Sequence, residues 1–351
     1  MRYRTLLKKI ASLFLLLLLL AGCASGASPA GGVSPSPAEL RGTELFAMDT
    51  YMELKGYGAS DALLEAAADR IRALEDALST TREESEISRL NRDGETNVSE
   101  ETYRILTRSL ELCRETGGAL DITVYPVVRA WGFTTQSYRV PERGEIAALL
   151  ETVDYRGIAR DDSTRAVSLP ESAEIDLGAV TKGYVVDVLR SLFEEAGVHD
   201  ALFNLGGNVL TMGTKPDGSL WHVGIQDPQG GLLGTVEITD KALITSGGYE
   251  RYFEDEDGNV YWHIMDPQTG YPADGGLLSV TVMGDEGIRC DALSTALFIM
   301  GTEGAEAFWR NHKDFDMLLV TSDGRLLLTP DAAAVFTPDE ACPYETAVIE
   351  P

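Results

Sequence analysis

The order of strand-like and helix-like segments narrows the choice of fold for this chain. Hydrophobic periodicity indicates many short elements that do not alternate regularly between the two types. The predicted strands are 44–58, 166–169, 174–177, 201–212, 221–226, 235–238, 242–245, 277–283, 317–321 and 325–329, and the predicted helices are 61–78, 99–116, 142–151, 178–196, 291–300 and 303–311. Residues 119–131 are expected to be extended at first, with Pro126 excluding a regular central strand. Without regular β-α alternation, the fold class is predicted to be α+β rather than doubly wound.

The first 22 residues have the pattern of a bacterial lipoprotein signal peptide. Four basic residues lie within the first nine, and the apolar run over 10–22 is too short to span a bilayer. The run ends in Leu20-Ala21-Gly22-Cys23, which resembles a lipobox, in which Cys23 becomes the lipid-modified first residue. The alternative is an ordinary secretory signal cleaved nearby. We expect the folded part to lie outside the cytoplasm, lipid-anchored to the bacterial cell membrane.

Composition suggests how the rest of the chain is divided. Residues 24–38 are rich in Ser, Pro, Gly and Ala, which is typical of a flexible tether. We therefore expect a signal peptide at 1–22, a tether over 23–42 after Cys23, a folded domain at 43–335 and a C-terminal tail at 336–351. The formal charge of -27 makes nucleic acid and anionic membrane surfaces poor partners. An anionic ligand would need a metal, a helix N-terminus or a few placed cations.

The stretch Asp291-Ala292-Leu293-Ser294-Thr295 opens an apolar run. On a helix, residues four apart lie on one face, so Asp291 and Thr295 would point the same way. Carboxylate and hydroxyl oxygens are ligands that Mg²⁺ prefers, and phosphate oxygens of a substrate would complete such a site. The alternative is that Asp291 caps the helix and Thr295 is merely packed.

A second stretch, 175–184, runs from a strand through Gly178 into a helix. This geometry presents a helix N-terminus to phosphate. Lys182 could contact a phosphate, and Asp176 could accept a hydrogen bond from a ribose hydroxyl or a ring nitrogen. Its spacing is that of neither a Walker loop nor a dinucleotide glycine motif, so a plain strand–helix turn is the alternative.

His263 lies at the end of a predicted strand, before a Pro/Gly turn at 266–270. It is a general base, a ligand-binding group or a satisfied core histidine. Zinc is not expected, because no cluster of His, Cys and carboxylates has ligand spacing. Apart from Cys23 the chain has three cysteines, an odd number that gives no disulfide framework.

Together these stretches resemble the ApbE family, the FAD:protein FMN transferases. The segments that carry the resemblance are Met48-Asp49-Thr50, Ser79 with 85–91, 118–123, Trp131-Gly132-Phe133, 176–187, 204–208, Thr245-Ser246-Gly247, 263–270 and 291–295. The resemblance implies a two-domain, T-fold-like α+β architecture with FAD in the inter-domain cleft. It implies Mg²⁺-dependent cleavage of the FAD pyrophosphate, transfer of FMN to a Thr or Ser hydroxyl of a target flavoprotein, and release of AMP.

The resemblance also implies roles for individual residues. The implied metal ligands are Asp291, Thr295, Ser294 and the carbonyl of Ala179. The implied FAD contacts are Met48, Thr81, Ala119, Leu120, Asp121, Asp176, Lys182 and Met265. His263 would accept the proton of the acceptor hydroxyl. The chain departs from the family at Thr81, where a large aromatic residue is common. A smaller side chain would leave the flavin less covered, so that water could compete with the acceptor.

The family's targets include subunits of Na⁺-translocating NADH:quinone reductases, Rnf-type complexes and extracytoplasmic flavin reductases. An enzyme anchored outside the cytoplasm suits such clients. Two alternatives stay open at this point: an FAD pyrophosphatase that gives FMN and AMP, and a flavin-binding lipoprotein without catalysis. Intact Asp291, Thr295 and His263 argue against pure binding, because a binding protein needs no base.

Overall fold

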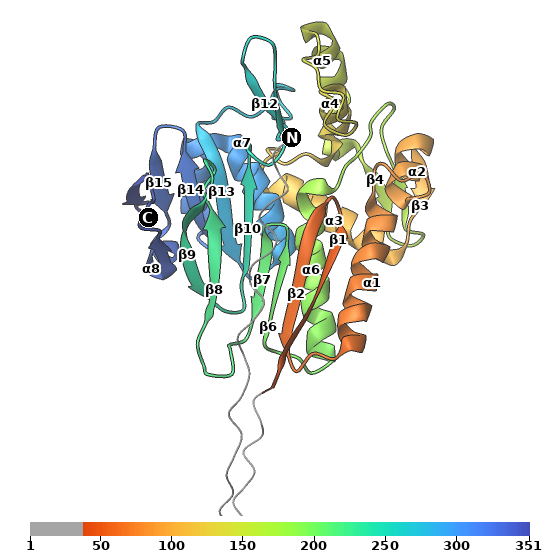
Figure 1. Ribbon diagram of the computed structural model, residues 1–351. Helices are drawn as coiled ribbons and strands as arrows, with labels where there is room; N and C mark the ends of the chain where they lie inside the picture. The colour runs from red at the N-terminus through yellow and green to blue at the C-terminus, as the bar shows by residue number, and fades with distance from the viewer. Residues whose placement is uncertain (1–37) are drawn as a thin grey trace, which may run out of the picture. The chain divides into compact units, whose positions relative to one another are not determined.

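A nine-stranded sheet organises residues 38–351, the part of the chain that the computed structural model describes (Figure 1). Its spatial order is β1-β2-β6-β7-β10-β13-β14-β15-β17. The strands are β1 Leu40–Ala47, β2 Thr50–Tyr57, β6 Ala201–Leu205, β7 Asn208–Met212, β10 Ala242–Gly247, β13 Leu277–Gly284, β14 Asp316–Thr321, β15 Arg325–Leu328 and β17 Glu345–Val348. Neighbouring strands are antiparallel except for the pair β15 and β17. Cys23 and the predicted signal peptide lie outside the described residues.

Long helices cover one face of this sheet and form the main core with it (Figure 1). They are α1 Asp61–Leu78, α6 Gly178–Glu195 and α7 Gly287–His312, with α3 Glu100–Glu115 packed behind α6 and α7. The helix predicted over 61–78 is confirmed. Its apolar residues recur at helical spacing and are buried, and Ser60 caps it by accepting a hydrogen bond from the N–H of Leu63 at 3.1 Å.

A small sheet covers part of the opposite face. It consists of β8 Trp221–Gln226, β9 Leu232–Ile238 and β16 Phe336–Pro338, in the order β16-β9-β8. With α8 Pro330–Val335 it forms a second core against the outer side of the large sheet. Central strands therefore bury both faces, as in β7, where all five residues are buried.

The remaining elements surround the rim of the sheet. A three-stranded sheet has the order β3-β5-β4, and a third small core joins α4, α5 and the hairpin β11–β12. These elements are α2 Glu86–Asp93, β3 Glu95–Asn97, η1 Ile122–Val124, α4 Tyr125–Ala130, α5 Arg143–Leu150, η2 Tyr155–Gly157, β4 Ala159–Asp161, β5 Ala166–Ser168, β11 Tyr252–Glu254 and β12 Val260–Trp262. The extended start expected for 119–131 ends at Asp121, directly before η1 begins. Pro126 lies in the first turn of α4, where its missing N–H is not needed, which confirms that no regular central strand passes through it.

The α+β class is confirmed, and the structure differs from the predicted layout in three respects. Residues 38–351 form one unit, so the expected cleft between domains lies within it. β1 begins at Leu40, inside the predicted tether, and the predicted tail at 336–351 contributes β16 and β17. The helices predicted at 291–300 and 303–311 are two parts of α7, broken at Gly301 with φ 72°. No helix within 38–351 has both the length and the hydropathy required to cross a bilayer.

Candidate active site

A cavity of about 840 Å³ collects segments that are far apart in the sequence. Its wall comes from the β1–β2 turn, the loop after α1, residues 119–125, the start of α6, the end of β10 with 249–251, residues 263–267 and one face of α7. Its volume is typical of small-molecule sites. Every site residue expected from the sequence within 38–351 lines this cavity except Ser294. The structure therefore brings the separate motifs together.

Asp291 is held by the close approach of α6 and α7. A Cβ atom at Gly183 would lie 2.3 Å from the carbonyl oxygen of Gly287 and 2.6 Å from Cβ of Asp291, so only glycine fits. This contact allows the N–H of Gly183 to donate a 2.8 Å hydrogen bond to Oδ2 of Asp291. Asp291 does not cap its helix, because α7 begins four residues earlier. Instead Asp187 caps α7, accepting from the N–H groups of Gly287 and Ile288 at 2.8 and 2.9 Å.

Ala179 lies close to this hydrogen bond, in the first turn of α6. In a regular helix its carbonyl accepts from the N–H four residues later, which is that of Gly183. The same N–H donates to Asp291. Ala179 lines the cavity, as does Asp291. The structure thus pairs a carboxylate with a carbonyl oxygen across the α6–α7 contact.

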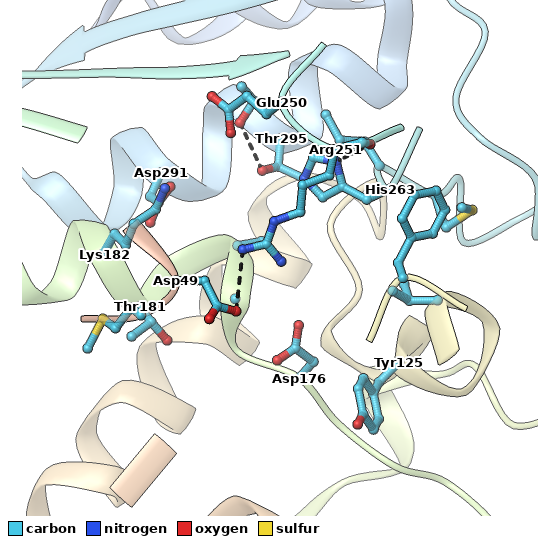
Figure 2. Close-up of a pocket in the computed structure, with 18 of the residues that line it drawn as sticks. Asp49, Tyr125, Asp176, Thr181, Lys182, Glu250, Arg251, His263, Asp291 and Thr295 are labelled. Atoms are coloured by element: carbon cyan, nitrogen blue, oxygen red, sulfur yellow. Dashed lines mark hydrogen bonds and ion pairs between the residues drawn. The ribbon is translucent and has the colours of Figure 1, made fainter. Parts of the chain in front are cut away.

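Hydroxyl groups extend this set of oxygens along α7 and β10. Thr295 lies one turn after Asp291, and its Oγ1 is 3.2 Å from Oγ of Ser246 (Figure 2). Ser294 is fully buried; its hydroxyl donates to the carbonyl of Asp291 at 2.9 Å and lies 2.8 Å from Ser246 Oγ. The role that the family resemblance implies for Ser294 at a metal stays a prediction; in the structure its hydroxyl contacts Ser246 and it is not among the residues that line the cavity. Ser246 belongs to the segment Thr245-Ser246-Gly247, for which the sequence indicated no specific role, and it lines the cavity.

The charge of Asp291 lacks an ion-pair partner in the described part of the chain. Burial raises the pKa of Asp291 to about 6, although the charge of Lys182 and the Gly183 N–H favour the ionised form. A cation bound beside it would compensate this buried charge. Within 38–351 no three His, Cys, Asp or Glu side chains are grouped as metal ligands, so the donors are one carboxylate and neutral oxygens. Hard oxygen donors completed by substrate phosphate fit Mg²⁺.

The start of α6 provides a site for anionic groups. Leu177 precedes the helix without a side-chain cap, and the carboxylate of Asp176 lies beside the N–H groups of Leu177 and Gly178. Gly178, Thr181 and Lys182 line the cavity in this first turn and the next. Among the ion pairs within 38–351, none involves Lys182. The helix terminus and the lysine together suit a pyrophosphate.

Asp176 lines the cavity, and hydrogen bonds to two other segments hold the backbone around it. The amide of Asn91 donates to the carbonyl of Ile175 at 2.8 Å and accepts from its N–H at 2.7 Å. The N–H of Asp176 donates to the carbonyl of Ile122 at 2.9 Å. Desolvation raises the pKa of the Asp176 carboxyl group. Asn91 is a second residue whose role the sequence did not indicate.

His263 is oriented by one backbone carbonyl. Both its N–H and its ring Nδ1 lie near the carbonyl oxygen of Arg251, at 3.1 and 3.3 Å. A carbonyl only accepts hydrogen bonds, so the proton is assigned to Nδ1 and Nε2 is left as the acceptor. Burial and the nearby charge of Arg251 lower the pKa of His263 to about 4. The imidazole is therefore neutral at pH 7, as a general base must be.

Arg251 also crosses the mouth of the cavity. Its guanidinium lies 3.8 Å from the carboxylate of Asp49, in the β1–β2 turn (Figure 2). Met48 and Asp49 both have positive φ, 50° and 59°, and the N–H of Met48 donates to Glu75 at 2.8 Å. This turn places Met48, an expected FAD contact, on the cavity wall.

The remaining expected FAD contacts surround the other end of the cavity. The carboxylate of Asp121 accepts from the N–H and hydroxyl of Thr123, at 2.9 and 2.6 Å, and from the N–H of Tyr155 at 3.2 Å. Asp121 thus caps η1. The N–H groups of Ala119 and Leu120 donate instead to the carbonyl and the hydroxyl of Thr116, both at 3.2 Å. Thr81 is exposed at the rim of the cavity, and its backbone N–H donates to Oγ of Ser79 at 3.1 Å. Met265 is buried in the third core and also lines the cavity.

Comparisons with known proteins agree on one relationship. A sequence profile of the ApbE family matches residues 48–319. Curated relatives named FAD:protein FMN transferase, from Klebsiella pneumoniae (strain 342) and Escherichia coli (strain K12), are 33% identical over 277 residues and 30% identical over 314 residues. The alignments cover 77% and 83% of this chain and 85% and 88% of the relatives.

Solved structures of ApbE proteins are also similar to this chain. The crystal structure of the ApbE protein from Thermotoga maritima is similar with a TM-score of 0.79 and 29% identity, over 85% of this chain and 99% of that one. The flavin transferase ApbE from Vibrio cholerae is similar with a TM-score of 0.74 and 27% identity, over 88% of this chain and 100% of that one. The likeness therefore extends over the whole cavity-bearing part of the chain.

Proposed function

The chain belongs to the ApbE family, and we propose that its cavity binds FAD and Mg²⁺ and transfers FMN to a Thr or Ser hydroxyl of a target flavoprotein. The activity itself, FAD:protein FMN transfer, follows from the relationship to enzymes of that name. One observation supports the detailed proposal above others. The carboxylate of Asp291, the carbonyl of Ala179 and the hydroxyl of Thr295 lie on the wall of the same cavity as a neutral His263.

The chain's own residues divide the work between binding and proton transfer. Lys182 and the N-terminus of α6 bind the pyrophosphate of FAD, while Asp176 and the backbone at Ala119 and Leu120 contact the rest of the dinucleotide. The hydroxyl oxygen of the acceptor attacks the FMN phosphorus, and the bond from that phosphorus to the oxygen bridging to AMP breaks. Nε2 of His263 takes the hydroxyl proton, and AMP leaves.

The metal proposed for this site would be held by Asp291, Thr295 and the carbonyl of Ala179. When bound, Mg²⁺ would neutralise pyrophosphate charge and stabilise the departing AMP. Ser246 and Ser294 keep Thr295 in place through their hydroxyl contacts. Gly183 fixes the carboxylate, so the ligands are arranged before substrate arrives.

The decisive experiment gives the mature protein FAD, Mg²⁺ and a peptide of the Asp-Ser/Ala/Gly-x-x-Thr type. Mass spectrometry then distinguishes three outcomes. A covalent FMN–peptide supports the transferase proposal. Free FMN and AMP without labelled peptide support a pyrophosphatase instead, and unchanged FAD supports a binding protein. Omitting Mg²⁺ from a parallel reaction tests the metal.

Hydrolysis is retained as a second candidate function because of Thr81. This side chain is small, exposed and on the cavity wall. An aromatic ring at this position would cover the flavin and exclude water, whereas threonine leaves room for it. Water would then compete with the acceptor hydroxyl for the same phosphorus.

We also propose that the enzyme works outside the cytoplasm, attached to the cell membrane by lipid on Cys23. The lipobox-like sequence and the residues that follow it support this proposal. Flavoprotein subunits of Na⁺-translocating NADH:quinone reductases, Rnf-type complexes and extracytoplasmic flavin reductases are the clients that we propose for such an enzyme.

A further inference from the structure

Phe46 and Tyr51 form an exposed aromatic pair at the tip of the β1–β2 hairpin. The two residues are directly opposite in the strand register, and their rings meet edge to face with centroids 5.1 Å apart. Phe46 is 60% exposed and Tyr51 is 80% exposed, the highest values among the large apolar side chains of residues 38–351. Such contiguous exposed apolar surface usually marks a site of interaction.

The pair is continuous with the mouth of the cavity. Between the two aromatic residues the chain makes the turn whose residues Met48, Asp49 and Thr50 line the cavity wall. A molecule that sends a group into the cavity from this side therefore meets the pair. Neither aromatic residue lines the cavity in which the nucleotide is proposed to bind, so the pair is placed for the second substrate.

Other exposed apolar side chains gather around the same mouth. Of the nine large ones within 38–351, six belong to this hairpin or to the structures on the other side of the cavity: Phe46, Tyr51, Tyr138, Val140, Tyr252 and Val260. Tyr138 stacks on Phe253 of β11 at 5.2 Å, which ties the loop after Phe133 to the β11–β12 hairpin. The base of that hairpin supplies Arg251 and His263 to the cavity. Exposed apolar side chains thus lie on segments that adjoin two different parts of the cavity wall.

We propose that Phe46 and Tyr51 dock the protein that accepts FMN, by contacting apolar surface around its hydroxyl-bearing segment. This inference rests on the proposed transfer to a protein hydroxyl, which requires a second macromolecule at this mouth. Aromatic side chains bury much area with few rotatable bonds, and they are enriched among residues that dominate interface energies. The pair would hold the acceptor while its hydroxyl reaches the cavity.

Charge favours a protein over a lipid surface as the occupant. Glu44 and Glu53 face each other in the register next to the pair, and Asp49 lies in the turn. An anionic bilayer would be repelled by these carboxylates and by the net charge of -27. A second copy of this chain seated here would cover the mouth that the acceptor needs.

The test compares three full-length proteins: the natural chain, the double variant Phe46→Thr with Tyr51→Thr, and the control Val348→Thr. Val348 is 53% exposed on β17, at the opposite edge of the large sheet. Threonine preserves strand propensity in all three positions. The probe is the folded FMN-accepting domain of a Na⁺-translocating NADH:quinone reductase subunit, titrated at saturating FAD and Mg²⁺.

For the double variant we expect KM for the folded domain to rise about tenfold, as when interface anchors are truncated. KM for a short Asp-Ser-x-x-Thr peptide and the affinity for FAD should stay as in the natural chain, and Val348→Thr should match the natural chain throughout. An unchanged KM of the double variant for the domain would overturn the inference. An equal rise in KM for the peptide, or an equal loss of affinity for FAD, would overturn it as well.

Two further readouts separate the other occupants. Binding to anionic vesicles and self-association are measured for the same proteins. If the double variant loses either property while its KM for the domain is unchanged, the pair contacts lipid or a second copy, and the proposal is overturned. If the natural chain labels neither the domain nor the peptide, the proposed function fails together with this inference. If it labels both, with equal KM in the double variant, only the docking inference fails.

Discussion

The backbone N–H of Gly183 on α6 donates a 2.8 Å hydrogen bond to Oδ2 of Asp291 on α7. This contact joins the two helices at the cavity wall and fixes the carboxylate without using a charged partner. The same N–H lies four residues after Ala179, whose carbonyl is another of the proposed metal ligands. Gly183 therefore connects two of the proposed ligands, which makes several properties of the site testable.

Replacing Gly183 by alanine should damage the site by steric overlap. The new Cβ would meet the backbone of α7 at Gly287, so the helices must move apart. We expect a loss of about 1–3 kcal/mol in the free energy of unfolding and a much weaker response to Mg²⁺. Denaturant unfolding with and without Mg²⁺ measures both. Gly144→Ala, in an open position on α5, should leave the response to Mg²⁺ unchanged and should not lower the free energy of unfolding, because alanine favours a helix.

Asp291→Asn should remove Mg²⁺-dependent turnover, yet stabilise the metal-free protein at pH 7. The folded state raises the pKa of Asp291 to about 6, so ionisation costs stability as the pH rises from about 4 through about 6. The cost at pH 7 is about 3 kcal/mol, and asparagine avoids it. Thermal unfolding of both proteins without metal between pH 4 and pH 8 tests this. Equal stability of the two proteins at pH 7 would contradict the burial argument, and full turnover by the variant would refute the metal assignment.

The pH dependence of transfer should have an acid limb that moves with the metal concentration. Protons compete with Mg²⁺ for Asp291, whose pKa is raised to about 6, whereas His263 is already neutral above pH 5 because its pKa is lowered to about 4. Rates measured from pH 4.5 to pH 8 at low and at saturating Mg²⁺ show whether the limb shifts to lower pH. An acid limb that stays at the same pH at both Mg²⁺ concentrations would indicate that a group other than Asp291 limits the rate.

His263→Ala should lower the transfer rate by roughly 10²–10⁴ while FAD still binds. The side chain is proposed to accept the hydroxyl proton through Nε2, and the dinucleotide is held by other residues. Flavin fluorescence quenching measures binding, and single-turnover labelling of the peptide measures transfer. His312→Ala, a substitution of an exposed histidine at the end of α7, is the matched control. Parallel loss of binding and transfer would give His263 a structural role instead.

Thr81→Tyr should raise the ratio of FMN attached to peptide over FMN released, by several-fold. The larger ring would cover the flavin at the rim, where threonine is exposed. Both products can be counted in one chromatographic run. Thr135→Tyr, in an exposed position that does not line the cavity, should leave the ratio unaltered. A higher rate of free FMN release in Thr81→Tyr would reverse the interpretation of this position.

Cys23→Ser should release the protein from membranes. Lipid attached at that sulfur is the proposed anchor, and serine cannot carry it through a thioether. Fractionation of cells that express each form, followed by immunodetection, gives the distribution. Cys342→Ser, which removes a free cysteine in the folded part, should leave the protein in the membrane fraction. Membrane retention of the Cys23 variant would count against the lipobox.

Sequence reasoning located the site motifs because their chemistry is local. Helical spacing placed Asp291 and Thr295 on one face, and the strand–glycine–helix pattern at 175–184 correctly indicated a helix starting at Gly178. The α+β class followed from the order of the elements. The family resemblance then indicated that these distant segments share one cavity, and the structure places them on one wall.

What the sequence did not indicate depends on contacts between distant segments. Gly183 matters because of a backbone oxygen about a hundred positions away, and Asn91 matters because of Ile175. Neither pairing leaves a periodic signal in the sequence. The buried position of Ser294 also depends on packing that its place in the sequence does not reveal. Pro126 was predicted to exclude a regular central strand, and it lies instead in the first turn of α4, a position that suits proline.

β1 begins at Leu40 and ends at Ala47, next to the turn that lines the cavity. Eight residues of extended chain span about 25 Å, so the point where the preceding segment joins lies a strand's length from the catalytic end. Mechanical load applied through the N-terminus would fall first on the ladder between Leu40 and Tyr57, not on the turn. The enzyme can therefore be held firmly at one end while the other end keeps its geometry and its freedom to meet clients.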